Sequence, residues 1–277
     1  MGLLSQVGVY TSVIASMSGV LASPTPPELP QPVVYSVEND TITTRDPVDT
    51  TASSLLSSSP AVKQLINGID ISSHQHKNSA SISMKKVLNS GEVKFFFIKA
   101  TEGTHYINPH FRSDTIEVID SNTPVGFYHY ARPSSSTNDA RKQARFFVHV
   151  TGIDNGVKSL PPVLDLEEDE GLSADELISW TKAFVDEVKT LTGRDVMIYT
   201  YPNFWKDSMA NTTQFNNLPL WIAEYNKGIT PGYTLPGGWN TWTFWQYTSK
   251  EEITGIAGDV DGNIFNGSEK QLHNMLK

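Results

Sequence analysis

From residue 67 onward, short and uniformly apolar runs alternate with longer segments of helical period. Strands that are apolar along their whole length are buried on both faces, which is typical of a parallel sheet covered by helices. The runs are 68–71, 93–100, 125–130, 163–167, 196–200, 220–223, 243–247 and 260–265. Eight such strands close a βα barrel. The sequence therefore predicts an α/β fold, a modified (β/α) TIM-like barrel over residues 61–277.

The intervening segments predict helices near 81–90, 109–120, 134–150 and 173–192. The last has the clearest signals. Ser173 and Glu176 form a capping box at its start, and Gly193 suits its end. One apolar stripe runs along it, formed by Leu177, Trp180, Phe184, Val188 and Leu191. Because all four helices precede residue 193, we expect fewer helices in the C-terminal third of the barrel.

Residues 1–60 have a different composition. They contain 7 of the 16 prolines, 18 Ser or Thr residues and no lysine. Such a stretch buries too little apolar surface to offset its ordering entropy, so we predict a flexible leader or linker. Val20-Leu21-Ala22 followed by Ser23 resembles a signal-peptide cleavage site, but the first basic residue is Arg45. The sequence is compatible with a cleaved signal peptide and equally with a disordered tail that stays attached.

Charge and composition exclude several classes of function. The net charge of −9 disfavours nucleic acid as a partner, because phosphate binding needs a basic surface. The absence of cysteine excludes disulfides, thiolate metal sites and thiol nucleophiles. No uninterrupted apolar run approaches the length of a membrane span, so we expect no stable membrane insertion.

Acidic residues follow the predicted strands. In a βα barrel the carboxyl ends of the strands face one mouth, where active sites are built. Six acids and several aromatic residues are expected there, and together they suit a sugar chain. The acids are Asp70, Glu102, Asp165, Glu167, Glu224 and Asp261, and the aromatic residues are Tyr128, Tyr199, Tyr201, Trp221, Tyr225 and Trp245. Any one acid at a strand end is more simply explained by contact with water; six at one mouth are not.

The pair Asp165-Leu166-Glu167 is the most informative of these features. On a strand, residues two apart point to the same face, about 6.6 Å apart. Two carboxyls this close oppose each other's ionisation, so one keeps its proton near neutral pH and can act as an acid. Glu168, Asp169 and Glu170 are interpreted as a solvated lead into the next helix.

A series of motifs resembles the glycoside hydrolase family 25 lysozymes, the Chalaropsis-type muramidases. The series opens with Asn67-Gly68-Ile69-Asp70-Ile71-Ser72 and Phe97-Ile98-Lys99-Ala100-Thr101-Glu102-Gly103. It continues in the family's order with 126–130, 164–167, 198–200, 220–225 and 244–247. The resemblance covers about residues 67–266. It implies hydrolysis of the β-1,4 bond between N-acetylmuramic acid and N-acetylglucosamine in bacterial peptidoglycan.

The resemblance also implies roles for single residues. Glu167 matches the family's proton donor, Asp165 its partner acid and Asp70 the first-strand catalytic aspartate. The late aspartate matches Asp261 or Asp259, and the spacing to Asn263 favours Asp261. The substrate-binding candidates are Glu102, Tyr128, Tyr199, Trp221, Glu224, Tyr225, Trp245 and Gln246.

Three alternatives fit the sequence less well. A chitinase-like barrel has two further acids upstream of this motif, where the present chain has Leu160 and Val163. A wall-binding or virion structural module would have no physical reason to keep paired, mutually repelling acids. A metal site would draw on His74, His76, His105 and His129, but their spacing gives no clear third ligand, so we expect no metal and no cofactor.

The expected setting follows from this substrate. We predict a monomer that acts on peptidoglycan glycan strands at the bacterial cell wall. It is either secreted or, as a phage lysin, delivered from the host cytoplasm.

Overall fold

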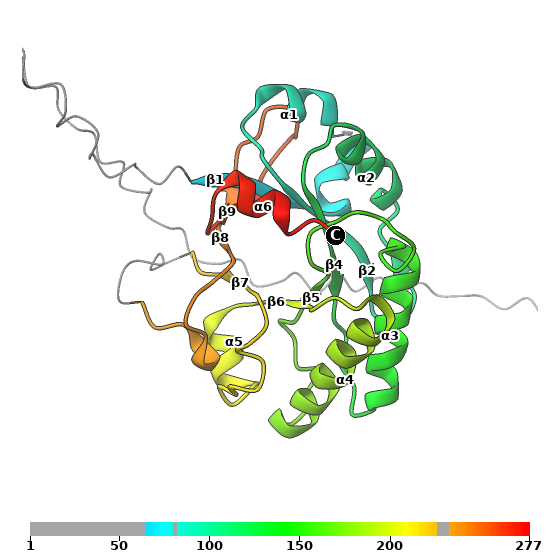
Figure 1. Ribbon diagram of the computed structural model, residues 1–277, viewed down its shortest axis with the longest axis vertical. Helices are drawn as coiled ribbons and strands as arrows, with labels where there is room; N and C mark the ends of the chain where they lie inside the picture. Colours follow the sequence, from blue (N-terminus) through cyan, green and yellow to red (C-terminus); the bar gives the residue numbers. More distant parts are fainter. Residues whose placement is uncertain (1–64, 80–81, 226–232) are drawn as a thin grey trace, which may run out of the picture. The chain divides into compact units, whose positions relative to one another are not determined.

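The computed structural model describes residues 65–79, 82–225 and 233–277, and the predicted leader at 1–60 lies outside these ranges. Its centre is a closed barrel (Figure 1). Going around the barrel, the strands are β1 (Ile66–Ile71), β2 (Phe96–Glu102), β4 (Val125–Tyr130), β5 (Val163–Asp165), β6 (Met197–Thr200), β7 (Leu220–Ala223), β8 (Phe244–Glu251) and β9 (Val260–Phe265). Pairing of β1 with β2 closes the ring. A short strand, β3 (Tyr106–Ile107), extends the sheet beyond β2. Each of the eight predicted strands is therefore present.

One strand departs from the predicted parallel sheet. β9 runs antiparallel to both of its neighbours, β8 and β1. The connection from β8 to β9 is short and contains no helix, over residues 252–259. A parallel return requires a long crossover, so the chain here turns back on itself instead. Asp261 on β9 consequently lies directly opposite Asp70 on β1.

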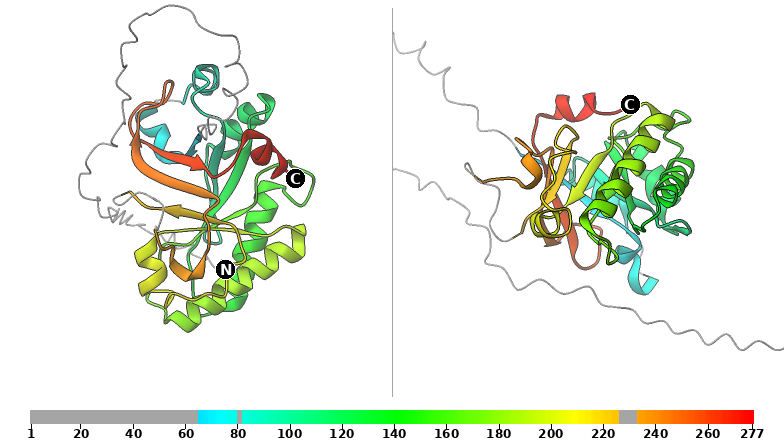
Figure 2. Two further views of the ribbon diagram at one scale, coloured as in Figure 1. Left: turned by 60° about the vertical axis from the view of Figure 1, so that its left-hand side comes forward. Right: turned by 90° about the horizontal axis from the view of Figure 1, so that it is seen from below.

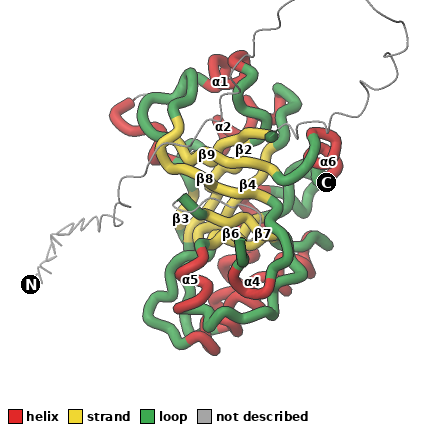
Figure 3. Tube along the Cα trace, turned by 90° about the vertical axis from the view of Figure 1, so that its left-hand side faces the viewer, coloured by secondary structure: helices red, strands yellow, loops and turns green. Residues whose placement is uncertain are grey.

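Helices surround the strands on the outside (Figure 3). They are η1 (Ser73–Ser79), α1 (Met84–Ser90), α2 (Phe111–Asp120), α3 (Thr137–Thr151), α4 (Ala174–Thr192), α5 (Pro202–Asp207), η2 (Pro236–Gly238) and α6 (Glu269–Asn274). The two longest, α3 and α4, lie side by side (Figure 2). Beyond residue 200 the described helices have six residues or fewer, which confirms the thinner C-terminal third.

Helix α4 forms as its sequence predicts, with one exception. The Ser173–Glu176 capping box is present, and Gly193 ends the helix in the left-handed conformation. Leu177, Trp180, Phe184 and Val188 are buried against the barrel, whereas Leu191 is 40% exposed. Leu191 lies in the last turn of the helix and belongs to neither apolar cluster of the described residues.

Side chains along the strands alternate between the barrel interior and the helical layer, apart from register irregularities after Lys99 on β2 and after Gln246 on β8. Phe97, Trp221 and Phe244 fill the middle of the interior. Gly126 on β4 makes room for them, since a Cβ at this position would lie 2.2 Å from the Phe97 ring. These aromatic side chains therefore fill the middle of the barrel interior, and the acidic side chains lie at one end of it.

The C-terminal segment closes the end of the barrel that lies opposite the carboxyl ends of the parallel strands. Helix α6 crosses the end where β1 begins and β9 ends (Figure 1), and Leu272 packs into the interior cluster there. The Lys277 backbone pairs with Ser159 just before β5. Buried Arg194 donates to the Ser159 and Leu160 carbonyl oxygens, each at 2.8 Å. In the described part of the chain, no helix has the length and apolar character needed to cross a bilayer.

Candidate active site

The predicted catalytic acids converge at the mouth of the barrel. Asp70 and Asp261 are cross-strand partners, Asp165 is the last residue of β5, and Glu167 follows two residues later. Their convergence is visible at Tyr128, an inward residue on β4. Burial raises the pKa of the Tyr128 hydroxyl, and all four acids raise it further through their charge. The four carboxyls thus share one site, as the sequence predicts.

Asp70 is held by neutral donors. Its Oδ2 accepts hydrogen bonds from Asn263 Nδ2 at 2.7 Å and Gln246 Nε2 at 2.8 Å. Burial raises the pKa of Asp70 to about 7, the two amides oppose that shift, and the charge of Glu167 adds to it. Asp70 is therefore fixed in position yet poised to exchange a proton near neutral pH.

The amides that hold Asp70 are themselves oriented from behind. The Trp221 indole Nε1 donates to Asn263 Oδ1 at 2.8 Å. Because an indole can only donate, the Asn263 amide nitrogen must face Asp70. The hydroxyls of Tyr199 and Tyr225 both donate to Gln246 Oε1, which turns the Gln246 nitrogen toward Asp70 in the same way.

Asp165 and Glu167 are the less stabilised pair. Asp165 is 6% exposed, and its Oδ1 contacts no hydrogen-bond donor among the described residues. Burial and then the charge of Glu167 raise the pKa of Asp165 well above its usual range. Burial also raises the pKa of Glu167, against the lowering influence of the Tyr130 hydroxyl. The geometry thus favours the protonated form of both groups, as a general acid requires.

Asp261 is affected similarly. Burial, followed by the charges of Asp70 and Glu167, raises its pKa well above the usual value for aspartate. The charge of Asp259 adds a smaller effect of the same sign. Asp259 is exposed in the connection before β9, whereas Asp261 lies opposite Asp70. Asp261 is therefore the one of the two candidates that faces the other acids.

A cleft of about 420 Å³ adjoins Glu167. It lies between the β5–α4 connection and α5. Its walls are formed by Glu167, Glu168, Asp169, Glu170, Tyr201, Asn203, Phe204, Asp207 and Ser208. The proton-donor candidate thus lines an open, strongly acidic depression.

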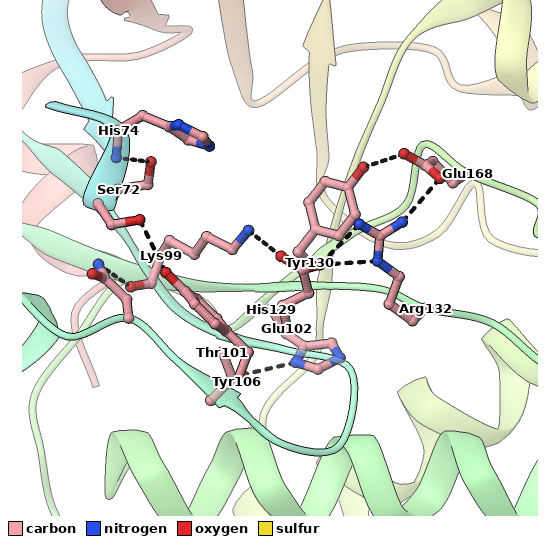
Figure 4. Close-up of polar contacts among 12 residues, drawn as sticks. Ser72, His74, Lys99, Thr101, Glu102, Tyr106, His129, Tyr130, Arg132 and Glu168 are labelled. Carbon is pink, nitrogen blue, oxygen red and sulfur yellow. Dashed lines mark hydrogen bonds and ion pairs between the residues drawn. The ribbon is translucent and has the colours of Figure 1, made fainter. Parts of the chain in front are cut away.

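A cationic cluster borders the acids on the β2 and β4 side (Figure 4). Lys99 Nζ lies 2.6 Å from Glu102 Oε2, and Arg132 Nε donates to Glu102 Oε1 at 2.9 Å. The Tyr130 ring lies between the two cations, with Lys99 Nζ 4.5 Å and Arg132 Cζ 4.8 Å from its centroid. Burial acts to raise the pKa of Glu102, but the two cations outweigh it and the pKa falls below the usual value. Glu102 is thus ionised.

Comparison with known proteins agrees with this geometry. The model of the glycosyl hydrolases family 25 matches residues 69–256. The chain belongs to that family.

Among its relatives, lysozyme M1 of Streptomyces globisporus is 36% identical over 224 residues, covering 77% of this chain and 72% of the relative. The N,O-diacetylmuramidase of Chalaropsis sp is 35% identical over 211 residues, covering 73% of this chain and 96% of the relative. The solved structure of the bacterial lysozyme from Streptomyces coelicolor superposes with a TM-score of 0.68 at 34% identity, covering 77% of this chain and 97% of the other.

Several substrate-binding candidates of this family 25 chain border the acids. Tyr128 and Tyr199 are inward and almost completely buried, and Tyr225 packs against the same interior cluster. Glu224 accepts a hydrogen bond from the Tyr233 hydroxyl at 2.8 Å. Gln246 reaches Asp70 directly. Tyr128, Tyr199 and Tyr225 adjoin the acids, because the charges of at least three of the four carboxyls raise the pKa of each hydroxyl.

Two tryptophans predicted to bind substrate do not offer a face to the site. Trp221 points inward but is only 2% exposed, so it offers no face to a ligand and instead orients Asn263. Trp245 packs against the outer cluster, and its indole donates to the Glu224 carbonyl at 2.8 Å. Trp245 and Gln246 are adjacent on β8, so they point to opposite faces. The structure does not bring Trp245 to the acids.

The histidines do not gather at one point. His76 Nε2 lies 2.9 Å from Asp114 Oδ2, and its ring stacks on His110 at 3.7 Å. His129 is buried on the outer side of β4, between Thr101 and Gln143. His105 pairs locally with Thr104. Among the described residues, no group of three or more potential ligands is suitably arranged for a metal ion.

Four residues that contact acids of the mouth are not among the site residues predicted from the sequence: Lys99, Tyr130, Arg132 and, as a hydrogen-bond donor to Asp70, Asn263. Period-two alternation signals the first two, since Lys99 shares the face of Phe97, and Tyr130 the face of Tyr128. Glu168 and Glu170 were interpreted as solvated. They are exposed, but both pair with Arg132. Nothing in the local sequence signals that contact, because the strands β4 and β5 have to pair first.

Proposed function

We propose that this chain is a lysozyme, a 1,4-β-N-acetylmuramidase. It hydrolyses the bond between N-acetylmuramic acid and N-acetylglucosamine in bacterial peptidoglycan. The observation that supports this function most is the set of four mutually interacting carboxyls, two buried and two half-buried, at the mouth of a family 25 barrel. Relatives named lysozyme and muramidase support the choice of substrate.

Each acid has a proposed role. Glu167 protonates the leaving glycosidic oxygen, because its raised pKa keeps the proton available and it borders the open cleft. Asp165 orients the 2-acetamido group of the muramic acid, whose carbonyl oxygen attacks the anomeric carbon. Asp70 and Asp261 balance the charge of the site.

The alternative within the same function is direct attack by water, activated by Asp70 or Asp261. The two routes differ in stereochemistry. Substrate assistance releases the β-anomer first, whereas single displacement by water releases the α-anomer. Proton NMR of the freshly formed reducing end distinguishes them, and an initial α-anomer would transfer the base role to Asp70 or Asp261.

The function itself is tested by incubating the protein with purified bacterial walls. We expect loss of turbidity, and mass spectrometry of the released muropeptides should show reducing-end muramic acid. Binding to walls without any release would favour the alternative, a non-hydrolytic wall-binding or virion module. Fragments with reducing-end glucosamine would assign the cleavage to the other glycosidic bond.

The setting follows from this substrate. We propose a monomer that is secreted and acts at the bacterial cell wall, with residues 1–60 as leader and linker. Intact-mass measurement of the protein from the culture medium tests this proposal. A mass lacking about the first 22 residues would support a cleaved signal at Ala22–Ser23, and a full-length mass would contradict cleavage.

A further inference from the structure

Arg132 links three parts of the barrel mouth. It follows β4 by two residues, and its guanidinium reaches acids on two other segments (Figure 4). Nη2 lies 2.8 Å from Glu102 Oε1 at the end of β2. Nη1 lies 2.9 Å from Glu168 Oε2 and 3.1 Å from Glu170 Oε1, both on the connection after β5. One cation therefore contacts three carboxylates.

The Arg132 backbone is fixed by a buried network. Gln143 on α3 donates through Nε2 to the Arg132 carbonyl at 2.6 Å and accepts through Oε1 from the Arg132 amide at 3.2 Å. His129 Nε2 lies 3.0 Å from the same Oε1, and burial lowers the pKa of His129 to about 4. The neutral ring therefore donates to Gln143 across the physiological range. A surface arginine with free backbone would hold its partners far less firmly.

The segment that Arg132 holds carries Glu167. Residues 166–172 belong to neither a helix nor a strand. Glu170 adopts a φ of 51°, in the left-handed region that disfavours a side chain, and its carboxylate is one of the three bound by Arg132. Glu168 is bound by Arg132 and also by the Tyr130 hydroxyl at 2.8 Å. Arg132 thus holds Glu168, which directly follows the proposed proton donor, and Glu170, which lies within the turn that Leu172 closes on the Asp169 carbonyl.

We propose that Arg132 is a positioning residue, which fixes the 166–172 segment so that Glu167 faces the glycosidic oxygen. Arg132 does so through Glu168 and Glu170 on one side and Glu102 on the other, and it contacts no reacting atom. This role deepens the proposed function and rests on Glu167 being the acid of that reaction. Misplacing a catalytic group by about 1 Å can cost about 100-fold in rate, so such a clamp matters.

Arg132 also affects the charge that Glu167 experiences. The charged groups acting on Glu167 come from every neighbouring element: the carboxyls of Asp70, Asp165, Asp261 and Glu168, and the cations Lys99 and Arg132. The Tyr130 hydroxyl acts on it as well. Arg132 and Lys99 lower the pKa of Glu167, whereas Glu168 raises it. Geometry and charge can therefore be separated by choosing which partner is changed.

The main test is Arg132→Met, assayed on a soluble oligosaccharide of alternating N-acetylmuramic acid and N-acetylglucosamine. We expect kcat to fall about 10- to 100-fold with little change in KM, because the acid is displaced while substrate contacts remain. The alkaline limb of the kcat–pH profile, where Glu167 loses its proton, should move to higher pH because a neighbouring cation is gone. A purely structural role would not move that limb.

Two further variants separate the contributions. Arg132→Lys keeps the charge but not the planar fork that reaches three carboxylates, so kcat should fall while the alkaline limb stays in place. Glu168→Gln loosens the clamp and removes a negative neighbour, so kcat should fall a few-fold and the limb should move to lower pH. Glu168 is exposed, which keeps this variant informative if Arg132→Met fails to fold.

The matched control is Arg145→Met, which removes a 2.7 Å ion pair with Glu187 on the outer helices. It should leave kcat, KM and the pH profile unchanged. Wild-type kcat in Arg132→Met, an equal loss in the control, or a raised KM at constant kcat would each overturn the proposal. If the unaltered protein releases no muropeptides, the proposed function fails first, and that result is distinct from an active protein indifferent to Arg132.

Discussion

The two ends of the barrel both bury charged side chains, but they differ in how those side chains are hydrogen-bonded. At the end closed by α6, buried Arg194 donates to backbone carbonyls, and Leu272 completes an apolar plug. At the mouth, Asp165 is equally buried, but one of its oxygens contacts no donor among the described residues. One end satisfies the polar groups it buries, whereas the other leaves acids desolvated and close to one another.

Within one sheet, the residues of the closed end stabilise the fold, whereas the acids of the mouth are held there at a cost in stability. Burying an ionised carboxyl without a cation is costly, and the group responds with a raised pKa. Asp70, Asp165, Glu167 and Asp261 all show that response, whereas Glu102, which is paired with Lys99 and Arg132, shows the reverse. Changes to the four acids with raised pKa should therefore alter activity without loss of stability, and changes to the apolar residues of the closed end should do the opposite.

The largest effect is expected for Glu167→Gln. Glutamine keeps the shape of the side chain but donates no acidic proton, and general acid catalysis contributes about 10²- to 10⁴-fold in rate. Wall lysis should fall by that factor, while the melting temperature stays the same or rises, because a desolvated acid has been removed. Turnover on purified walls and thermal unfolding of the same sample measure both quantities. A folded Glu167→Gln protein with ordinary turnover would refute the assignment of the acid.

The second effect belongs to the closed end. Leu272→Ala removes a side chain that is 1% exposed, and such changes cost about 2–5 kcal/mol of unfolding free energy. At temperatures well below the transition, the specific activity should match that of the unaltered protein. Leu191→Ala is the matched control, because Leu191 is 40% exposed and should change stability by less than about 1 kcal/mol. Lost activity in folded Leu272→Ala would show that the two ends are coupled.

The fold was largely predictable because its signals are local. Each strand is an apolar run, and the Ser173–Glu176 capping box marks the start of α4 as predicted. The antiparallel β9 was not predicted, because strand direction depends on how residues 252–259 connect β8 to β9 and not on the apolar pattern of either strand. Leu191 fits the helical stripe but is 40% exposed, because burial depends on which elements pack against that turn and not on the stripe alone.

The acids of the site could be predicted from the sequence, but the residues that hold them in position could not. Asp70, Asp165, Glu167 and Asp261 follow from strand ends and motif order. Trp245 was placed at the site together with Gln246 because both lie in the predicted strand 243–247, although alternation sends neighbouring residues to opposite faces. The contacts of Arg132 with Glu168 and Glu170 join segments 36 and 38 residues apart, so no local pattern signals them.

The smallest effect, and the sharpest test of the comparison, is expected for Asp70→Asn. The pKa of Asp70 is raised to about 7 from 3.8, so the folded state binds a proton that the unfolded state has already lost between those pH values. The cost of holding this acid is therefore absent at pH 4 and grows as the pH rises to 7. Asparagine removes that cost while its oxygen still accepts from Asn263 and Gln246. The variant should be more stable than the unaltered protein by about 1–3 kcal/mol at pH 7, and equally stable near pH 4.

Glu102→Gln is the companion variant with the opposite sign. The pKa of Glu102 is lowered by its two cations despite burial, so its stabilising contribution is present above its unfolded pKa and is lost as the pH falls through the folded value. Glutamine should therefore destabilise the protein at pH 7, and the difference should shrink in acid. Urea unfolding of both variants at pH 4 and pH 7 measures the two trends. If Asp70→Asn were destabilising at pH 7, the buried acids of the mouth would be contributing to stability, and the contrast between the two ends of the barrel would have to be abandoned.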